Sequence, residues 1–226
     1  MSTPLPIRPL SPRRRRERLI VALTIIVLTT LGIGSVTWAF GPRYYKLWRY
    51  QPQPGDIVVQ SSPSNPLVRA IEGATDSPWS HCGIVAYEDG AWVVYEASSY
   101  VTGTPLSEVI LRSRDEQYAI YRLKPEYRQH IPRVLAEVKN LSRRPYDAKY
   151  ELDDEKIYCS ELIYKAYLKA TGEELGRLVR LRDLRWKPFA EIITKLEGGP
   201  PPLDRQMITP RDLAQAEQLE LVMSSP

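Results

Sequence analysis

The chain of 226 residues has few cysteines and histidines, two of each. Two cysteines exclude a disulfide-rich scaffold, and so few Cys and His side chains do not predict a structural zinc site. The sequence also lacks a glycine-rich phosphate loop and a dinucleotide fingerprint, so we predict no metal and no cofactor. Hydrophobic residues at 43% and charged residues at 26% exclude wholesale disorder, and the length fits one sizeable domain or two small ones.

Basic residues are concentrated at the N-terminus. The chain carries a net charge of +4, yet residues 1–40 alone hold six arginines against a single acidic residue, Glu17. Residues 41–226 therefore carry 25 basic and 26 acidic side chains. Because the bulk of the chain is nearly neutral, we predict no nucleic-acid partner.

A stretch of 22 uncharged residues, Leu19–Phe40, follows these arginines. As a helix it would be about 33 Å long, enough to span a hydrocarbon core of about 30 Å. Trp38, Tyr44 and Trp48 at its far end fit an interfacial aromatic belt. The arginines place the N-terminus in the cytoplasm by the positive-inside rule. We therefore expect a single-pass membrane protein with its folded domain on the extracytoplasmic side.

Two other interpretations of this stretch are a cleaved signal peptide and a buried core helix. A signal peptide has a shorter apolar region of about 7–15 residues before small residues at the cleavage site, whereas this stretch ends in Trp-Ala-Phe-Gly. A core helix would carry more polar residues on one face. The predicted organisation is a basic cytoplasmic segment (1–18), a transmembrane helix (19–40), a linker (41–54) and a folded domain (55–226).

The folded domain alternates short strand patterns with a few helix patterns. Strands are predicted at 56–60, 81–87, 92–98 and 118–123, helices at 65–73, 131–141 and 159–172, and a loop at 198–202, while 213–222 fits a helix or a strand. Strands with few intervening helices indicate an α+β fold with a mostly antiparallel sheet.

The two strands around Glu88-Asp89-Gly90 form a predicted hairpin whose register can be derived. A two-residue Asp89-Gly90 turn opposes residues whose numbers sum to 179, so Gly83 faces Glu96. His81 and Glu96 then become diagonal neighbours on one face, within reach of a carboxylate–imidazole hydrogen bond. A three-residue turn would instead put Glu96 on the opposite face.

Cys159 begins an amphipathic helix, on the side that packs inward. Unpaired backbone N–H groups and the helix dipole at that position favour a thiolate. If this helix end abuts the hairpin, the three side chains form a nucleophile, a general base and an orienting carboxylate, with the Cys159 amide as one oxyanion donor.

Each of these residues also has a purely structural interpretation. A lone cysteine at a helix start is commonly a small buried hydrophobe, and a strand histidine a half-buried hydrogen-bonding residue. Cys82 follows His81 and is predicted to point to the opposite face, into the core, which argues against a Cys82–Cys159 disulfide. His130, before a helix, is predicted to be a surface residue.

Six short blocks of sequence resemble a known family. They are Gly55-Asp-Ile-Val, Ala70-Ile-Glu-Gly-Ala-Thr, Trp79-Ser-His-Cys-Gly-Ile-Val, Tyr95-Glu-Ala, Tyr158-Cys-Ser-Glu-Leu and Ile208-Thr-Pro-Arg-Asp-Leu. Together they resemble the YiiX/YebB-like cysteine hydrolases, which are NlpC-type, circularly permuted papain-like proteins, over residues 52–222. The order His81, Glu96, Cys159 is the papain-like cyclic order cut at another point.

The resemblance implies that Cys159 is the nucleophile, His81 the base and Glu96 the residue that orients it. It also implies a small, barrel-like, mostly antiparallel sheet packed on the cysteine-bearing helix. Glu161 belongs to the same block, although a carboxylate in a first helical turn also has a structural explanation. Tyr158 and Ser80 are candidates for the second oxyanion donor.

Two classes of function follow. The first is a membrane-anchored cysteine hydrolase acting on an amide, an ester or a thioester, with peptide-like or cell-envelope substrates implied by the resemblance. Lipid acyl transfer or hydrolysis is its enzymatic alternative, because a neighbouring branch resembling lecithin:retinol acyltransferases handles acyl chains. The second class is an inactive domain that binds a peptide or glycan. The basic run Arg177–Lys187 is interpreted as a solvated segment over packed leucines, with contact to anionic headgroups as the alternative.

Overall fold

The computed structural model describes residues 24, 26–30 and 49–225 and divides the chain into two units, Met1–Arg49 and Tyr50–Pro226. In the first unit, Thr24 and residues 26–30 are helical, and the hydroxyls of Thr29 and Thr30 donate to the carbonyl of Ile26. No helix among the described residues is both long and apolar enough to cross a membrane. Most of the predicted transmembrane segment, 19–40, lies outside them.

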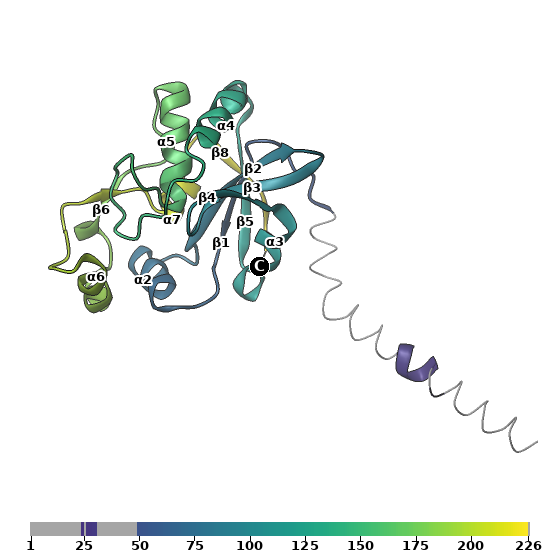
Figure 1. Ribbon diagram of the computed structural model, residues 1–226, viewed down its shortest axis with the longest axis horizontal. Coiled ribbons are helices and arrows are strands. Elements are labelled where there is room, and N and C mark those ends of the chain that lie inside the picture. Colours follow the sequence, from purple (N-terminus) through teal and green to yellow (C-terminus); the bar gives the residue numbers. More distant parts are fainter. Residues whose placement is uncertain (1–23, 25, 31–48, 226) are drawn as a thin grey trace, which may run out of the picture. The chain divides into compact units, whose positions relative to one another are not determined.

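The second unit is built on a six-stranded antiparallel sheet (Figure 1). Its strands are β1 (Ile57–Gln60), β2 (His81–Glu88), β3 (Ala91–Ala97), β4 (Val101–Pro105), β5 (Tyr118–Leu123) and β8 (Leu219–Ser224). They are ordered β4-β3-β2-β1-β5-β8, and β4 and β8 are the two edges. The antiparallel α+β prediction is confirmed. The predicted barrel-like form is wrong, because β4 and β8 do not pair with each other and the sheet stays open.

The β2–β3 hairpin has the predicted register. Ile84 pairs with Tyr95 and Val85 with Val94, so opposed residue numbers sum to 179. Asp89 and Gly90 both have positive φ (48° and 83°), as a two-residue type I′ turn requires. A Cβ at Gly83 would lie 2.4 Å from Val94 Cγ1 and 2.8 Å from the Tyr95 carbonyl oxygen, so only glycine fits beside Glu96.

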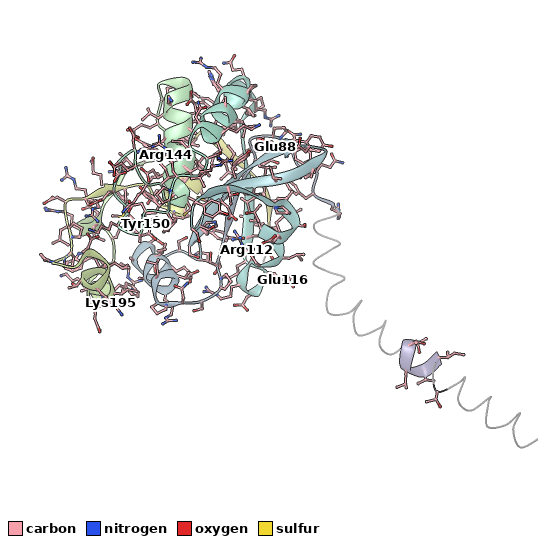
Figure 2. All side chains as sticks on the ribbon, in the orientation of Figure 1. Glu88, Arg112, Glu116, Arg144, Tyr150 and Lys195 are labelled. Atoms are coloured by element: carbon pink, nitrogen blue, oxygen red, sulfur yellow. The ribbon has the colours of Figure 1, made fainter. Side chains whose placement is uncertain are left out.

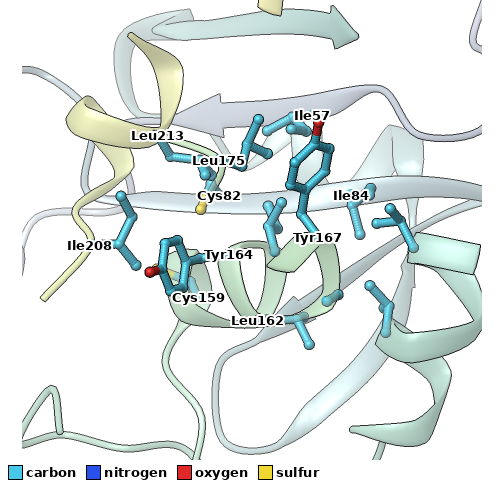
Figure 3. Close-up of a cluster of buried hydrophobic side chains, with 14 of the residues drawn as sticks. Ile57, Cys82, Ile84, Cys159, Leu162, Tyr164, Tyr167, Leu175, Ile208 and Leu213 are labelled. Atoms are coloured by element: carbon cyan, nitrogen blue, oxygen red, sulfur yellow. The ribbon is translucent and has the colours of Figure 1, made fainter. Parts of the chain in front are cut away.

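The helices are α2 (Pro66–Thr75), α3 (Leu106–Leu111), α4 (Ile131–Asn140), α5 (Cys159–Thr171), α6 (Ala190–Glu197) and α7 (Pro210–Ala214). Helix α5 lies beside α4 and packs on the sheet face that carries Cys82 and Ile84, where it forms the main hydrophobic cluster (Figure 3). Helix α3 contacts β3 and β4, and its last turn reaches the other face, which carries Glu96.

Local sequence accounts for the helix ends. Asn65 accepts the Val68 N–H at the start of α2, and Thr209 accepts the Asp212 N–H at the start of α7. Gly172 ends α5 with φ 80°, in the left-handed region that favours glycine.

Three regions differ from the sequence-based prediction. Strand β4 and helix α3 were not predicted, because their short apolar runs lack a clear period. The segment 213–222 divides into the end of α7 and strand β8. The basic run lies in a separate small layer made of a two-stranded sheet, β6 (Val179–Arg180) and β7 (Gln206–Met207), together with α6. Its Leu181 is buried, while Arg182 and Arg185 form exposed ion pairs with Asp204 and Asp76.

Candidate active site

His81 and Glu96, predicted as diagonal neighbours, are in direct contact. His81 is the first residue of β2, and its Nε2 lies 2.6 Å from Glu96 Oε2. The His81 side chain is 12% exposed and that of Glu96 is 1% exposed. Because Nε2 is hydrogen-bonded to the carboxylate, Nδ1 is the imidazole nitrogen left for another partner.

The Glu96 carboxylate has two more partners, both missed from sequence. Thr104 on β4 donates to Oε1 at 2.7 Å, and Arg112, directly after α3, donates through Nη2 to Oε2. Thr104 pairs with Val94 in the β3–β4 ladder, which brings its side chain to the face of Glu96. A continuous strand pattern after Ser99 would have indicated Thr104 from the sequence. No sequence pattern would have indicated Arg112.

Cys159 is the first residue of α5, as predicted, and is 2% exposed. The N-terminus of this helix is held by Glu161, whose Oε2 accepts the Tyr158 N–H at 3.1 Å. Lys165 Nζ lies 2.9 Å from the other oxygen of this buried carboxylate. Burial raises the pKa of Glu161 to about 7, although the hydrogen bonds with Lys165 and with the Tyr158 N–H lower it. These contacts give Glu161 a structural role at the helix end.

The three predicted residues form one electrostatic unit. Burial lowers the pKa of His81, but hydrogen bonds to Cys159 and Glu96, with their negative charges, outweigh it and raise that pKa to about 9. Burial likewise raises the pKa of Glu96, and the hydrogen bonds and positive charges of His81 and Arg112 lower it to about 2. The site therefore favours an imidazolium beside a carboxylate at neutral pH.

Cys159 completes the unit as a thiolate. A hydrogen bond from the Cys82 thiol is the largest cause that holds the pKa of Cys159 well below its usual range. Burial opposes this shift, and the hydrogen bond and positive charge of His81 add to it. A thiolate paired with an imidazolium is the resting state of a cysteine nucleophile.

The prediction for Cys82 was correct for its burial and wrong for its isolation from Cys159. Cys82 is fully buried, both cysteines are free thiols, and both belong to the same hydrophobic cluster (Figure 3). The reason is that α5 packs on the Cys82 face of β2, whereas His81 lies at the very start of the strand. The pKa of Cys82 is raised, by burial first and by the Cys159 thiolate second, so Cys82 is a neutral donor.

Two tyrosines before α5 extend the site. The hydroxyls of Tyr146 and Tyr150 are 3.1 Å apart, and the Tyr150 ring lies 5.0 Å from that of Tyr158. Burial and then the negative charge of Cys159 raise the pKa of Tyr150. Tyr150 also has an unfavourable φ of 58°. The two oxyanion candidates hold loops instead: Tyr158 Oη accepts the Ile208 N–H, and Ser80 Oγ accepts the Ser62 N–H.

An apolar pocket includes the residue that follows Cys159. Ser160 and Tyr150 both belong to its lining. Its apolar wall comes from α2, from the segment before α6, from α6 itself and from β7 and the residue after it: Leu67, Ala70, Ile71, Ala74, Leu181, Leu184, Ile192, Ile193, Leu196, Met207 and Ile208. The segment after Gly198 therefore contributes to the wall of this pocket, through Pro202, Arg205 and Met207.

Comparison with known proteins decides the family. The family model for permuted papain-like amidase enzymes (YaeF/YiiX, C92 family) matches residues 51–223. The chain belongs to this family. It is accordingly a cysteine hydrolase of the amidase or peptidase type, as the sequence predicted.

Two relatives from Escherichia coli share most of the folded domain with this permuted papain-like amidase. The uncharacterized protein YiiX of strain K12 is 30% identical over 176 residues, which cover 76% of this chain and 87% of the relative. The crystal structure of yiiX from strain O157:H7, described as a metalloprotein, is 29% identical with a TM-score of 0.70 and covers 78% of this chain and 99% of that one. In residues 24, 26–30 and 49–225 of the present amidase, no group of three or more His, Cys, Asp or Glu side chains is arranged to hold a metal ion.

Proposed function

We propose that this amidase hydrolyses an amide bond of a peptide-like or cell-envelope substrate through an acyl-enzyme on Cys159. The observation that carries the proposal is the pairing of His81 Nε2 with Glu96 Oε2 at 2.6 Å. Cys159, whose pKa is held well below its usual range, interacts with the same imidazole. An inactive binding domain would not need these three residue types to be retained together.

Each proposed step assigns one task to one residue. The Cys159 thiolate attacks the carbonyl carbon, and the Cys159 N–H at the start of α5 donates a hydrogen bond to the developing oxyanion. The His81 imidazolium gives its Nδ1 proton to the leaving amine as the C–N bond breaks and a thioester remains. Water then loses a proton to His81 and attacks the thioester, and the thiolate is released.

A second candidate substrate class is an acyl chain, favoured by the apolar pocket beside Ser160. Ser160 lines this pocket and directly follows Cys159 in sequence, and the candidate requires that an acyl chain held there extends to Cys159, which is not part of the lining. The enzyme would then cleave a fatty acyl ester or amide or transfer the acyl group. The catalytic steps are the same, and only the group held in the pocket differs.

A panel of substrates separates the two candidates. Peptide amides and fatty acyl p-nitrophenyl esters and anilides of 2–16 carbons are to be assayed with the full-length protein in detergent. If the pocket holds an acyl chain, Ala74→Phe fills it and lowers kcat/KM for long chains about tenfold with little effect on two-carbon substrates. Ala91→Phe, on the exposed hairpin, is the matched control. Hydrolysis of peptide amides alone, unaffected by Ala74→Phe, would eliminate the acyl candidate.

We also propose that residues 19–40 anchor the enzyme in a membrane with its folded domain outside the cytoplasm. Support comes from the 22 uncharged residues and the arginines that precede them. The double substitution Val27→Arg/Leu28→Arg raises the free energy of membrane insertion by about 2.5–3.5 kcal/mol for each arginine at the bilayer centre. We expect alkaline carbonate to release this variant and not the wild type or Thr29→Ser/Thr30→Ser. Release of the wild type would refute anchoring. The orientation is tested by adding protease to spheroplasts, and protection of the folded domain from that protease would refute it.

A further inference from the structure

Arg112 contacts the one carboxylate on which the catalytic imidazole depends. Arg112 caps the C-terminal end of α3 (Figure 2). Its side chain, 30% exposed, contacts the 1%-exposed Glu96. Its Nη2 donates to Oε2, the same oxygen that His81 contacts. One oxygen atom therefore receives hydrogen bonds from two cationic groups.

The guanidinium is itself held by a buried neighbour of His81. Gln60 is 1% exposed and pairs with His81 in the β1–β2 ladder. In the orientation of the Gln60 side-chain amide that pairs its oxygen with donors and its nitrogen with acceptors, Gln60 accepts a hydrogen bond from Arg112 Nε at 3.2 Å and donates one to Ser113 Oγ at 3.0 Å. Arg112 is thus fixed between Glu96 and the strand that flanks the catalytic histidine.

Charges alternate along this row of side chains. The Cys159 thiolate, the His81 imidazolium, the Glu96 carboxylate and the Arg112 guanidinium follow one another, so every charge lies between or beside opposite charges. We propose that Arg112 is a positioning residue that fixes the Glu96 carboxylate and limits how strongly it holds a proton on His81. This inference rests on the proposed thiol–imidazole mechanism.

The physical reason is electrostatic. Without Arg112, the full negative charge of a buried carboxylate would act on His81 alone, and removal of a nearby positive charge favours the protonated form of every group around it. The other titratable groups that face the row are Cys82 on β2 and Tyr146 and Tyr150 before α5. These are neutral at pH 7 with or without Arg112, so they do not replace its charge.

The test follows two titrations in the full-length protein in detergent. One is the rate at which iodoacetamide alkylates Cys159, assigned by peptide mass spectrometry. The other is the NMR titration of histidine, which the chain's two histidines make simple to assign, with His130 as the reference. In Arg112→Met we expect both midpoints to rise by about one pH unit, which lowers the alkylation rate on the acidic limb about tenfold. Arg112→Lys keeps the charge and should restore at least half of the shift.

Two controls separate charge from structure. Arg114→Met removes an arginine two residues away that pairs with Glu72 and does not touch the site, so both midpoints should stay unchanged. In Glu96→Gln the further change Arg112→Met should shift both midpoints much less than it does in the wild type, because the carboxylate through which it acts is gone and only the direct effect of the guanidinium charge remains. A folded Arg112→Met protein with wild-type midpoints, or a folded Arg112→Lys protein whose midpoints shift as far as those of Arg112→Met, would overturn the inference. A wild-type Cys159 that titrates as an ordinary thiol would instead refute the proposed mechanism itself.

Discussion

Replacement of Cys159 by alanine is expected to abolish hydrolysis, with a loss of at least about 10⁴-fold in kcat/KM on any substrate that the wild-type enzyme cleaves. No neighbouring group can replace the thiolate. Cys82 is fully buried and its raised pKa keeps it protonated, and the Ser160 hydroxyl donates to the Ile208 carbonyl at 2.8 Å. The fold should survive, because the change removes one buried sulfur atom and costs about 1 kcal/mol of unfolding free energy.

The measurement compares progress curves with thermal unfolding for the same preparations. Cys82→Ser is the matched variant, because a hydroxyl at this position can still donate to Cys159 and its loss of turnover should be far smaller. Wild-type turnover in Cys159→Ala would eliminate Cys159 as the nucleophile. Complete loss in Cys82→Ser together with turnover in Cys159→Ala would assign the chemistry to the other cysteine.

Replacement of His81 by alanine is expected to change the reactivity of Cys159 as well as turnover. The imidazolium both donates to the thiolate and supplies positive charge beside it, so without His81 the pKa of Cys159 rises. We expect alkylation by iodoacetamide at pH 6 to fall at least about tenfold, and hydrolysis to fall about 10³-fold or more because the leaving group loses its proton donor.

The pH dependence has a defined sign. The thiolate–imidazolium pair exists above the lowered pKa of Cys159 and below the pKa of His81, about 9, so turnover should fall on the alkaline side near pH 9.

Glu96→Gln keeps the imidazole and removes only its charged partner, so it should lose less activity than His81→Ala. The reverse order in folded variants would contradict the roles assigned to these two residues.

The sequence was sufficient for the part of the site that depends on local rules. The pairing of His81 with Glu96 follows from a two-residue turn with positive φ at Asp89 and Gly90 and from the alternation of side chains in a hairpin. The start of α5 at Cys159 and its end at Gly172 follow from an amphipathic pattern and a glycine C-cap. Such features are fixed by residues close together in sequence.

The parts that sequence reasoning missed depend on long-range packing. Arg112 reaches Glu96 because the six-residue helix α3 ends with the following residue close to β3, and nothing in the sequence around either residue indicates that contact. Cys82 was assigned to a face distant from Cys159 because strand alternation does not say on which face a helix packs. The contribution of α6 to the pocket wall was also missed, because it depends on how three segments that are distant in sequence are arranged.

The order of the site residues along the chain has a consequence for biosynthesis. His81 and Glu96 belong to adjacent strands of one hairpin, a local contact that forms rapidly in a folding chain. Cys159 joins them only after α5, which is synthesised much later, has packed on the sheet. Until then the thiol lacks His81 and Cys82 as partners and stays largely protonated. An emerging or translocating chain would thus carry an unreactive cysteine, and nucleophilicity would arise with completion of the fold.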